Sequence, residues 1–132
     1  MTEKNHPIVE LLEQDQRYDF EAYQFVRDAL QYAQEIMQMP AEEGATDSHI
    51  SGQQLCEAIR LHGIEQFGFL SKLVLNSWGV YSTGDFGEIV YNLIRIKHMK
   101  KSDSDRREHF DDVYDFSEAF EPVFQYSGGA DS

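Results

Sequence analysis

The chain has 132 residues, of which 41% are hydrophobic, and its 24 acidic residues against 11 basic ones give a formal net charge of −13. A chain of this length can bury about 68% of the surface that its unfolded form exposes, so it can form one core without disulfides or metals. The length excludes a protein kinase, a complete doubly wound dehydrogenase and a (β/α)₈ barrel. The aromatic content of 13% excludes a wholly disordered chain, and the negative charge disfavours non-specific binding to nucleic acids.

Three features of the sequence indicate a cytoplasmic protein. Cys56 is the only cysteine, so no disulfide can form within the chain, which is typical of a reducing compartment. The first residues are polar, and no apolar signal segment follows them. No apolar run approaches the ~20 residues that a membrane-spanning helix needs. We therefore expect a cytoplasmic protein without membrane contact, with one helical domain over residues 1–126 and a disordered tail over 127–132.

The first third of the chain predicts two helices. Pro7 suits the first position of a short helix over residues 7–15. A longer helix follows, since apolar residues recur there at spacings of three and four. Those residues are Tyr23, Val26, Leu30, Ala33 and Met37. Asp19 can cap this helix and Pro40 can stop it.

The clearest helix start in the sequence lies at Ser51. Ser51 and Gln54 fit a capping box, in which each side chain accepts a hydrogen bond from the other residue's backbone amide. Gly68 is expected to end this helix in a left-handed conformation, and Gly63 is a candidate for an earlier break.

A further helix is expected from Phe69 to Trp78, with Gly79 ending it. The spacing of its apolar residues predicts that Leu70, Leu73, Val74 and Trp78 face the core.

The strongest core stripe lies in the next predicted helix, from Thr83 to Lys97. Its apolar residues, at helical spacing throughout, are Phe86, Ile89, Val90, Leu93 and Ile94. Acidic residues begin the helix and basic residues end it, an order that suits the helix dipole.

Residues 98–116 leave the fold open between two arrangements. The segment fits either a short β-hairpin or a loop with a helical turn. Two helices joined by a short turn and followed by a hairpin are the element order of a winged-helix domain, whereas a loop there gives a helix bundle. The expected fold class is therefore mainly α: a compact helical domain, either winged-helix-like with a hairpin near residues 98–116 or a bundle.

Four segments, residues 51–60, 76–80, 85–90 and 112–116, together resemble an uncharacterised family of small bacterial proteins, found mainly in planctomycetes and verrucomicrobia. The resemblance extends from about residue 22 to residue 120. It implies no activity, ligand or catalytic residue. The basic segment 95–101 departs from the family pattern, which is more apolar there.

No residue pattern predicts a catalytic or metal site. Asp85-Phe86-Gly87 matches a kinase tripeptide in letters only, because the other kinase motifs are absent. The candidate metal ligands of the middle region, His49, Cys56 and His62, are too loosely spaced. The acidic residues of the last third, which could hold Ca²⁺ or Mg²⁺ weakly, fit a solvated face better; they are Glu108, Asp111, Asp112 and Asp115. We expect no cofactor, and nothing in the sequence supports catalysis.

The preferred hypothesis is a non-catalytic module that binds another protein or a second copy of itself. Phe69, Tyr81 and Tyr91 lie off or at the margin of the inward stripes, so they are the candidate contact residues.

The alternative is a winged-helix regulator that binds nucleic acid through its basic 95–107 segment. The candidate phosphate contacts are Arg95, Lys97, Lys100, Lys101, Arg106 and Arg107. Asp85 and Glu88 oppose this alternative, because acids would then face the groove. An unrecognised hydrolase or metal enzyme is the third hypothesis.

Overall fold

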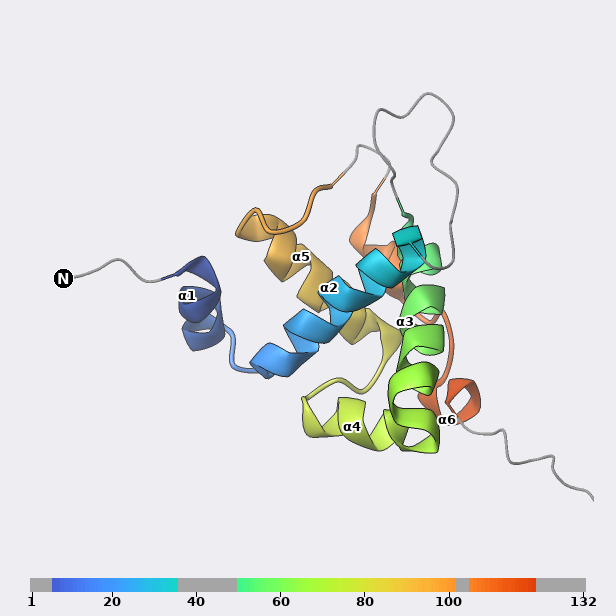
Figure 1. Ribbon diagram of the computed structural model, residues 1–132. Coiled ribbons are helices and arrows are strands. Elements are labelled where there is room, and N and C mark those ends of the chain that lie inside the picture. The colour runs from blue at the N-terminus through green and yellow to red at the C-terminus, as the bar shows by residue number, and fades with distance from the viewer. Residues whose placement is uncertain (1–5, 36–49, 102–104, 121–132) are drawn as a thin grey trace, which may run out of the picture.

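The computed structural model describes residues 6–35, 50–101 and 105–120, and within these ranges it is helical and contains no strand. The elements, labelled in Figure 1 where space allows, are α1 (Pro7–Gln14), α2 (Phe20–Glu35), α3 (Gly52–Phe67), the 3₁₀ helix η1 (Gly68–Leu70), α4 (Ser71–Ser77), α5 (Thr83–Arg95), the 3₁₀ helix η2 (Arg107–Phe110) and α6 (Phe116–Ala119). The mainly α prediction is confirmed. No helix of the described ranges is both long and apolar enough to cross a bilayer. The predicted stop at Pro40 and the predicted tail over 127–132 fall outside these ranges.

The core lies where α2, α3 and α5 meet (Figure 1). Tyr23 and Val26 of α2 and Ile59 of α3 are almost completely buried there. The predicted stripe of α5 is confirmed, since Phe86 and Leu93 have no exposed surface. Burying an aliphatic or aromatic side chain of this size stabilises the fold by about 1.5–3 kcal/mol before entropy is subtracted, so α5 is central to the fold.

The signals at the ends of α3 are partly confirmed. Ser51 Oγ accepts from the Gln54 amide at 3.1 Å, and Gln54 Oε1 accepts from the Ser51 amide at 2.9 Å, which is the predicted capping box. Gly68 does end α3 with a positive φ of 58°, although its ψ of −134° lies outside the left-handed helical region. The predicted break at Gly63 is wrong: Gly63 is buried inside α3, where a Cβ atom built on it would make ordinary van der Waals contacts with the rings of Phe120 and Phe25, at 3.4 and 3.5 Å.

Gly79 ends the helix before it in the way the sequence predicts. The Val80 amide donates to the Leu75 carbonyl and the Gly79 amide to the Asn76 carbonyl, which together form a Schellman motif with Gly79 at φ 92°. Lys97 occupies the same position after α5, with a φ of 65°. The chain therefore turns sharply at both ends of the 79–97 region.

The predicted β-hairpin near residues 98–116 is wrong for the part of that segment that the structure describes. Residues 107–110 form a 3₁₀ helix, with the His109 amide bonded to the Arg106 carbonyl, and no strand flanks it. The reason is packing: Phe110 is buried against Gly87 of α5, where a Cβ atom on Gly87 would lie 2.8 Å from the Phe110 Cβ. A segment that covers α5 cannot project from the domain as a wing, so the winged-helix expectation is not supported.

Candidate functional site

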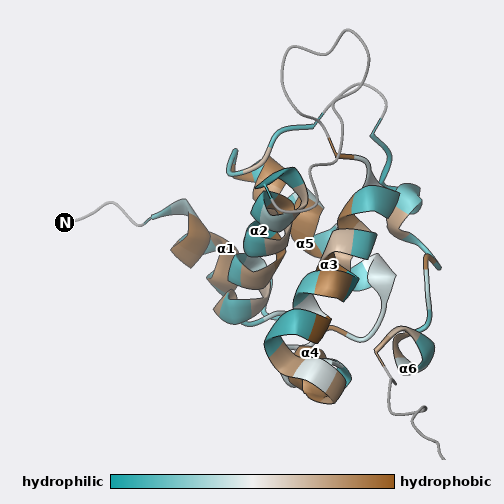
Figure 2. Ribbon diagram, turned by 45° about the vertical axis from the view of Figure 1, so that its right-hand side comes forward, coloured by the Kyte–Doolittle hydropathy of each residue, from teal (hydrophilic) through white to brown (hydrophobic). Residues whose placement is uncertain are grey.

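The largest departure from the predicted core lies on η1 and α4. Leu70 and Leu73, which the apolar spacing predicts to face inward, are 47% and 66% exposed, and Phe69 beside them is 64% exposed. Single exposed apolar side chains are ordinary, but a group of them is typical of an interaction site. We call Phe69, Leu70 and Leu73 the α4 patch. It lies at the end of the molecule where Figure 2 shows hydrophobic ribbon on α4.

The α4 patch is exposed because Ser71 and Leu75, rather than Leu70 and Leu73, face the core. Ser71 Oγ lies 2.8 Å from the Gly63 carbonyl oxygen and 2.7 Å from that of Gly68, and its single proton donates to one of them at a time. These contacts hold the start of α4 close to α3. Once Ser71 faces α3, the helical period turns Leu73 to the outside.

An open cleft of about 500 Å³ adjoins α4. Its walls come from α4, from the turn before α5, and from the start of α6 with the segment that leads into it. In both views α4 and α6 lie at the same end of the molecule (Figures 1 and 2). The residues that line it are Lys72, Tyr81, Ser82, Asp112, Tyr114, Asp115, Phe116 and Ser117. The cleft therefore combines aromatic rings with two carboxylates and one ammonium group.

Hydrogen bonds hold several of the cleft residues in place. Lys72 Nζ donates to Ser117 Oγ at 2.8 Å, and the Ser117 amide donates to Asp115 Oδ1 at 2.7 Å, which caps α6. Tyr114 donates its hydroxyl proton to the Cys56 carbonyl at 2.6 Å, and burial raises the pKa of Tyr114 well above its usual value. Asp112 is exposed and has a φ of 52°.

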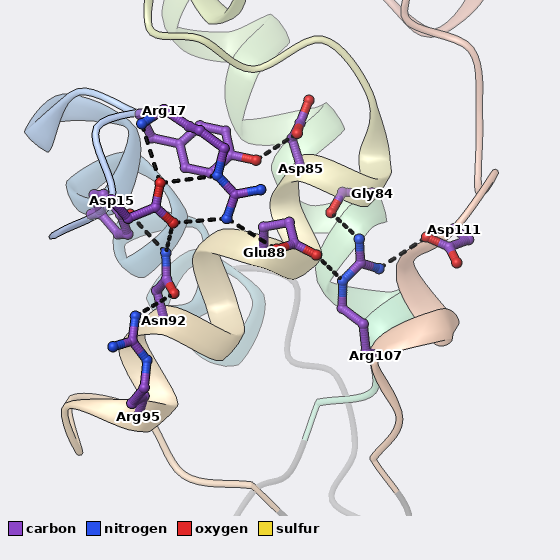
Figure 3. Close-up of polar contacts among 11 residues, drawn as sticks. Asp15, Arg17, Gly84, Asp85, Glu88, Asn92, Arg95, Arg107 and Asp111 are labelled. Carbon is purple, nitrogen blue, oxygen red and sulfur yellow. Dashed lines mark hydrogen bonds and ion pairs between the residues drawn. The ribbon is translucent and has the colours of Figure 1, made fainter. Parts of the chain in front are cut away.

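A second polar group, which we call the ion-pair clasp, joins the α1–α2 turn to α5 and η2 (Figure 3). Arg17 pairs with Asp15 at 2.7 Å and with Glu88 at 3.1 Å, and Glu88 accepts a further bond from Arg107 Nε at 2.7 Å. Arg107 also bonds Asp111 Oδ1 at 2.9 Å. Three acids and two arginines are paired here, so the clasp is structural and presents little uncompensated charge.

The clasp lowers the pKa of its two central carboxylates. The hydrogen bond from Arg17 is the main reason why the pKa of Asp15 lies well below its usual value. The hydrogen bond from Arg107 has the same effect on the pKa of Glu88. Both groups therefore stay ionised through the neutral range.

Two polar residues of α5 also serve the fold. Asp85 accepts hydrogen bonds from the amides of Tyr81 and Ser82 and from the Tyr18 hydroxyl, so it caps α5. Asn92 is buried and donates to the Tyr23 hydroxyl and to Asp15 at 3.0 Å each. The face of α5 that a recognition helix would present to a DNA groove is therefore covered by other parts of the chain.

The basic residues of the nucleic-acid hypothesis do not form one open patch. Arg107 is held by the clasp and by the Gly84 carbonyl at 2.8 Å. Arg95 donates to the Asn92 side chain at 2.8 Å. The other four, Lys97, Lys100, Lys101 and Arg106, lie on the surface.

The three predicted protein-contact residues have different surroundings. Tyr81 is 66% exposed and Phe69 is 64% exposed, whereas Tyr91 is half-buried against the core and its hydroxyl oxygen has no hydrogen-bond partner among the described residues. Tyr91 is therefore a poor candidate for surface contact. Leu70 and Leu73 are not predicted as contact residues, because their spacing fits an inward stripe. The small polar residue between them, Ser71, is the one signal in the sequence that this side of the helix could face a neighbouring helix closely.

The residues considered for metal or nucleophile chemistry are not assembled into a site in the described ranges. Cys56 is fully buried, and burial raises the pKa of its thiol to about 12, so it is a poor nucleophile. His62 stacks on Phe25 at 5.1 Å between ring centroids. Residues 111–115 are not helical, so Asp111 and Asp115 do not share a helix face. No three potential ligands converge within the part of the chain that the structure describes, and His49 lies outside it.

Comparison of the chain with protein-family models, with curated proteins and with solved structures finds no match.

Proposed function

We propose that this protein is a non-catalytic module that binds a partner protein through the α4 patch. The observation that carries the proposal is the exposure of Leu73, Leu70 and Phe69 on consecutive turns of one short helical region. Covering these side chains removes apolar surface from water, at about 25 cal/mol for each Å² buried. Tyr81, another strongly exposed side chain near this end, extends the available apolar area toward the cleft.

Charge favours a basic partner protein over a second copy of this chain. The net charge of −13 makes two copies repel each other and attracts a basic protein over several ångströms. Asp112 and Asp115 are exposed and line the cleft beside α4, and Lys72 is the one cation among the described residues that lines it with them. The occupant we assign to the α4 patch is therefore an apolar surface of another protein, rimmed by basic residues.

The nucleic-acid alternative has less support. Arg107, one of the six predicted phosphate contacts, is committed to Glu88, Asp111 and a backbone carbonyl. Phosphate binding by Arg107 would require breaking that clasp.

Affinity capture with the full chain, identification of the captured proteins, and calorimetry with each purified candidate test the proposal. We expect a basic protein whose dissociation constant rises at least about tenfold with Leu73→Asp, because a carboxylate would be buried in an apolar contact. Val9→Asp is the matched control, since Val9 is 42% exposed on α1, and it should change the constant less than about twofold.

Two results would contradict the proposal. One is that no captured protein depends on Leu73. The other is a homodimer in light scattering that Leu73→Asp dissociates, which would make a second copy the occupant.

A further inference from the structure

We infer that the cleft beside α4 receives an arginine side chain of the protein that docks on the α4 patch. The inference rests on the proposed function and adds to it the chemistry of the partner's central contact. It depends on the residues that line the cleft, on the position of the cleft relative to the patch, and on the balance of charge inside it.

The cleft offers both kinds of contact that a guanidinium group uses. Tyr81 is 66% exposed and presents a ring on which a planar cation can stack. Asp112 and Asp115, on the segment before α6, line the same cleft and are exposed. Asp115 uses Oδ1 to accept the Ser117 amide, and its Oδ2 accepts no hydrogen bond from the described residues.

The cleft and the α4 patch belong to one continuous surface. Lys72, which lines the cleft, lies directly between Ser71 and Leu73 in the chain, so one wall of the cleft is the same short helix that carries Leu73 of the patch. A partner segment whose apolar side chains cover Leu73 can therefore place a long side chain in the cleft.

The charge balance selects a cation over an anion. Among the described residues, Lys72 is the only cation that lines the cleft, and its ammonium group donates to Ser117 Oγ at 2.8 Å. Two carboxylates outnumber it. Arginine fits better than lysine because its planar fork can pair with a carboxylate and stack on a ring at the same time.

Small probes test the cleft without the partner. N-acetyl-arginine amide is titrated into the ¹⁵N-labelled full chain, with N-acetyl-citrulline amide as the neutral isostere, and amide shifts are followed. We expect the arginine probe to shift Tyr81 and residues 112–117 in a saturable way, and the citrulline probe to shift them far less. Added salt should weaken the arginine titration, because exposed ion pairs are screened.

Matched variants assign the effect to the cleft. Asp112→Asn should weaken arginine binding about threefold or more, and asparagine tolerates the positive φ of this position. Asp28→Asn on the exposed side of α2 removes the same charge and should leave binding unchanged. Tyr81→Leu should weaken binding, and Tyr81→Phe should preserve it, since phenylalanine keeps the ring face.

The inference is overturned if citrulline binds as well as arginine, if N-acetyl-glutamate amide binds at Lys72 instead, or if no probe shifts the cleft amides. After such a result, the proposed function is still supported if Leu73→Asp weakens the binding of a captured basic protein. The opposite combination is also informative: the cleft binds arginine, but Leu73→Asp does not change the affinity of the partner. That result would contradict the proposed function and this inference, because the cleft would then be a cation site unrelated to docking.

Discussion

Gly79 is the glycine at which an added side chain would lie closest to another part of the chain. Its φ is 92°, and a Cβ atom built on it would lie 2.0 Å from the Arg17 carbonyl oxygen. That contact brings the α1–α2 turn against the turn between α4 and α5, where the Asp19 amide also donates to the Trp78 carbonyl at 3.1 Å. The need for glycine here therefore has two separate causes, the backbone conformation and the neighbouring chain.

Gly79→Ala should lower the free energy of unfolding by at least about 2 kcal/mol, because the turn must both strain and move apart. Gly68→Ala is the matched control: Gly68 also has a positive φ, but nothing lies within 4 Å of the point that an alanine Cβ would occupy, so only the conformational cost applies and the loss should be smaller than that of Gly79→Ala. Urea unfolding followed by circular dichroism measures both. Equal losses would show that the contact with Arg17 is unimportant.

At the scale of the elements, the ion-pair clasp decides what the 105–111 segment does. Arg107 attaches η2 to α5 through Glu88 and the Gly84 carbonyl, while Phe110 packs under it. The sequence placed Arg107 in a phosphate-binding wing, because basic residues in a turn-rich segment carry no indication of which acid they will meet. Glu88 lies 19 residues earlier, and only the packing of η2 on α5 brings the two together.

Acid should weaken the clasp in a measurable way. The folded-state pKa values of Asp15 and Glu88 lie below their unfolded values, so the unfolded chain binds more protons as the pH falls. The stability that the clasp contributes is present in full above about pH 5 and is lost as the pH falls through the unfolded values, near 4, toward the folded ones.

The variant Asp15→Asn/Glu88→Gln should therefore lose about 1–2 kcal/mol of unfolding free energy near pH 7, a figure that allows for partial solvent screening. Below about pH 4 the difference from wild type should shrink. Glu13→Gln/Asp28→Asn removes two exposed acids outside the clasp and serves as the control. A variant that loses the same stability at every pH would contradict the assignment.

At the scale of the whole molecule, charge and burial together oppose nucleic-acid binding. The chain carries −13 overall, and the outer face of α5 is covered by the clasp and by η2. The remaining surface cations, such as Lys100 and Arg106, lie beyond the end of α5.

We expect no shift of a labelled duplex by the full chain in a gel, even at about 50 mM salt, where proteins with several phosphate contacts bind most tightly. A shift that Lys100→Glu/Arg106→Glu abolishes would contradict this expectation and restore the nucleic-acid hypothesis. A shift that survives the two changes would implicate a different surface.

Features that depend on near neighbours in the chain could be predicted without the structure. The capping box at Ser51, the stop at Gly79 and the apolar stripe of α5 are of this kind, because caps, Schellman motifs and helical spacing involve residues only a few positions apart. The helical class followed from these signals.

Two other features, the side of α4 that meets the core and the segment that covers α5, depend on contacts between distant parts of the chain. Both faces of α4 carry leucines, and the helical spacing predicted that the face of Leu73 turns inward. In the structure Ser71 bonds the Gly63 carbonyl, Leu75 faces the core and Leu73 is exposed. The 98–116 segment likewise had no strong local preference, and its contacts with α5 excluded a wing. Close packing decides which face of a helix and which segment cover the core, and its contribution to the free energy exists only once the helices are assembled.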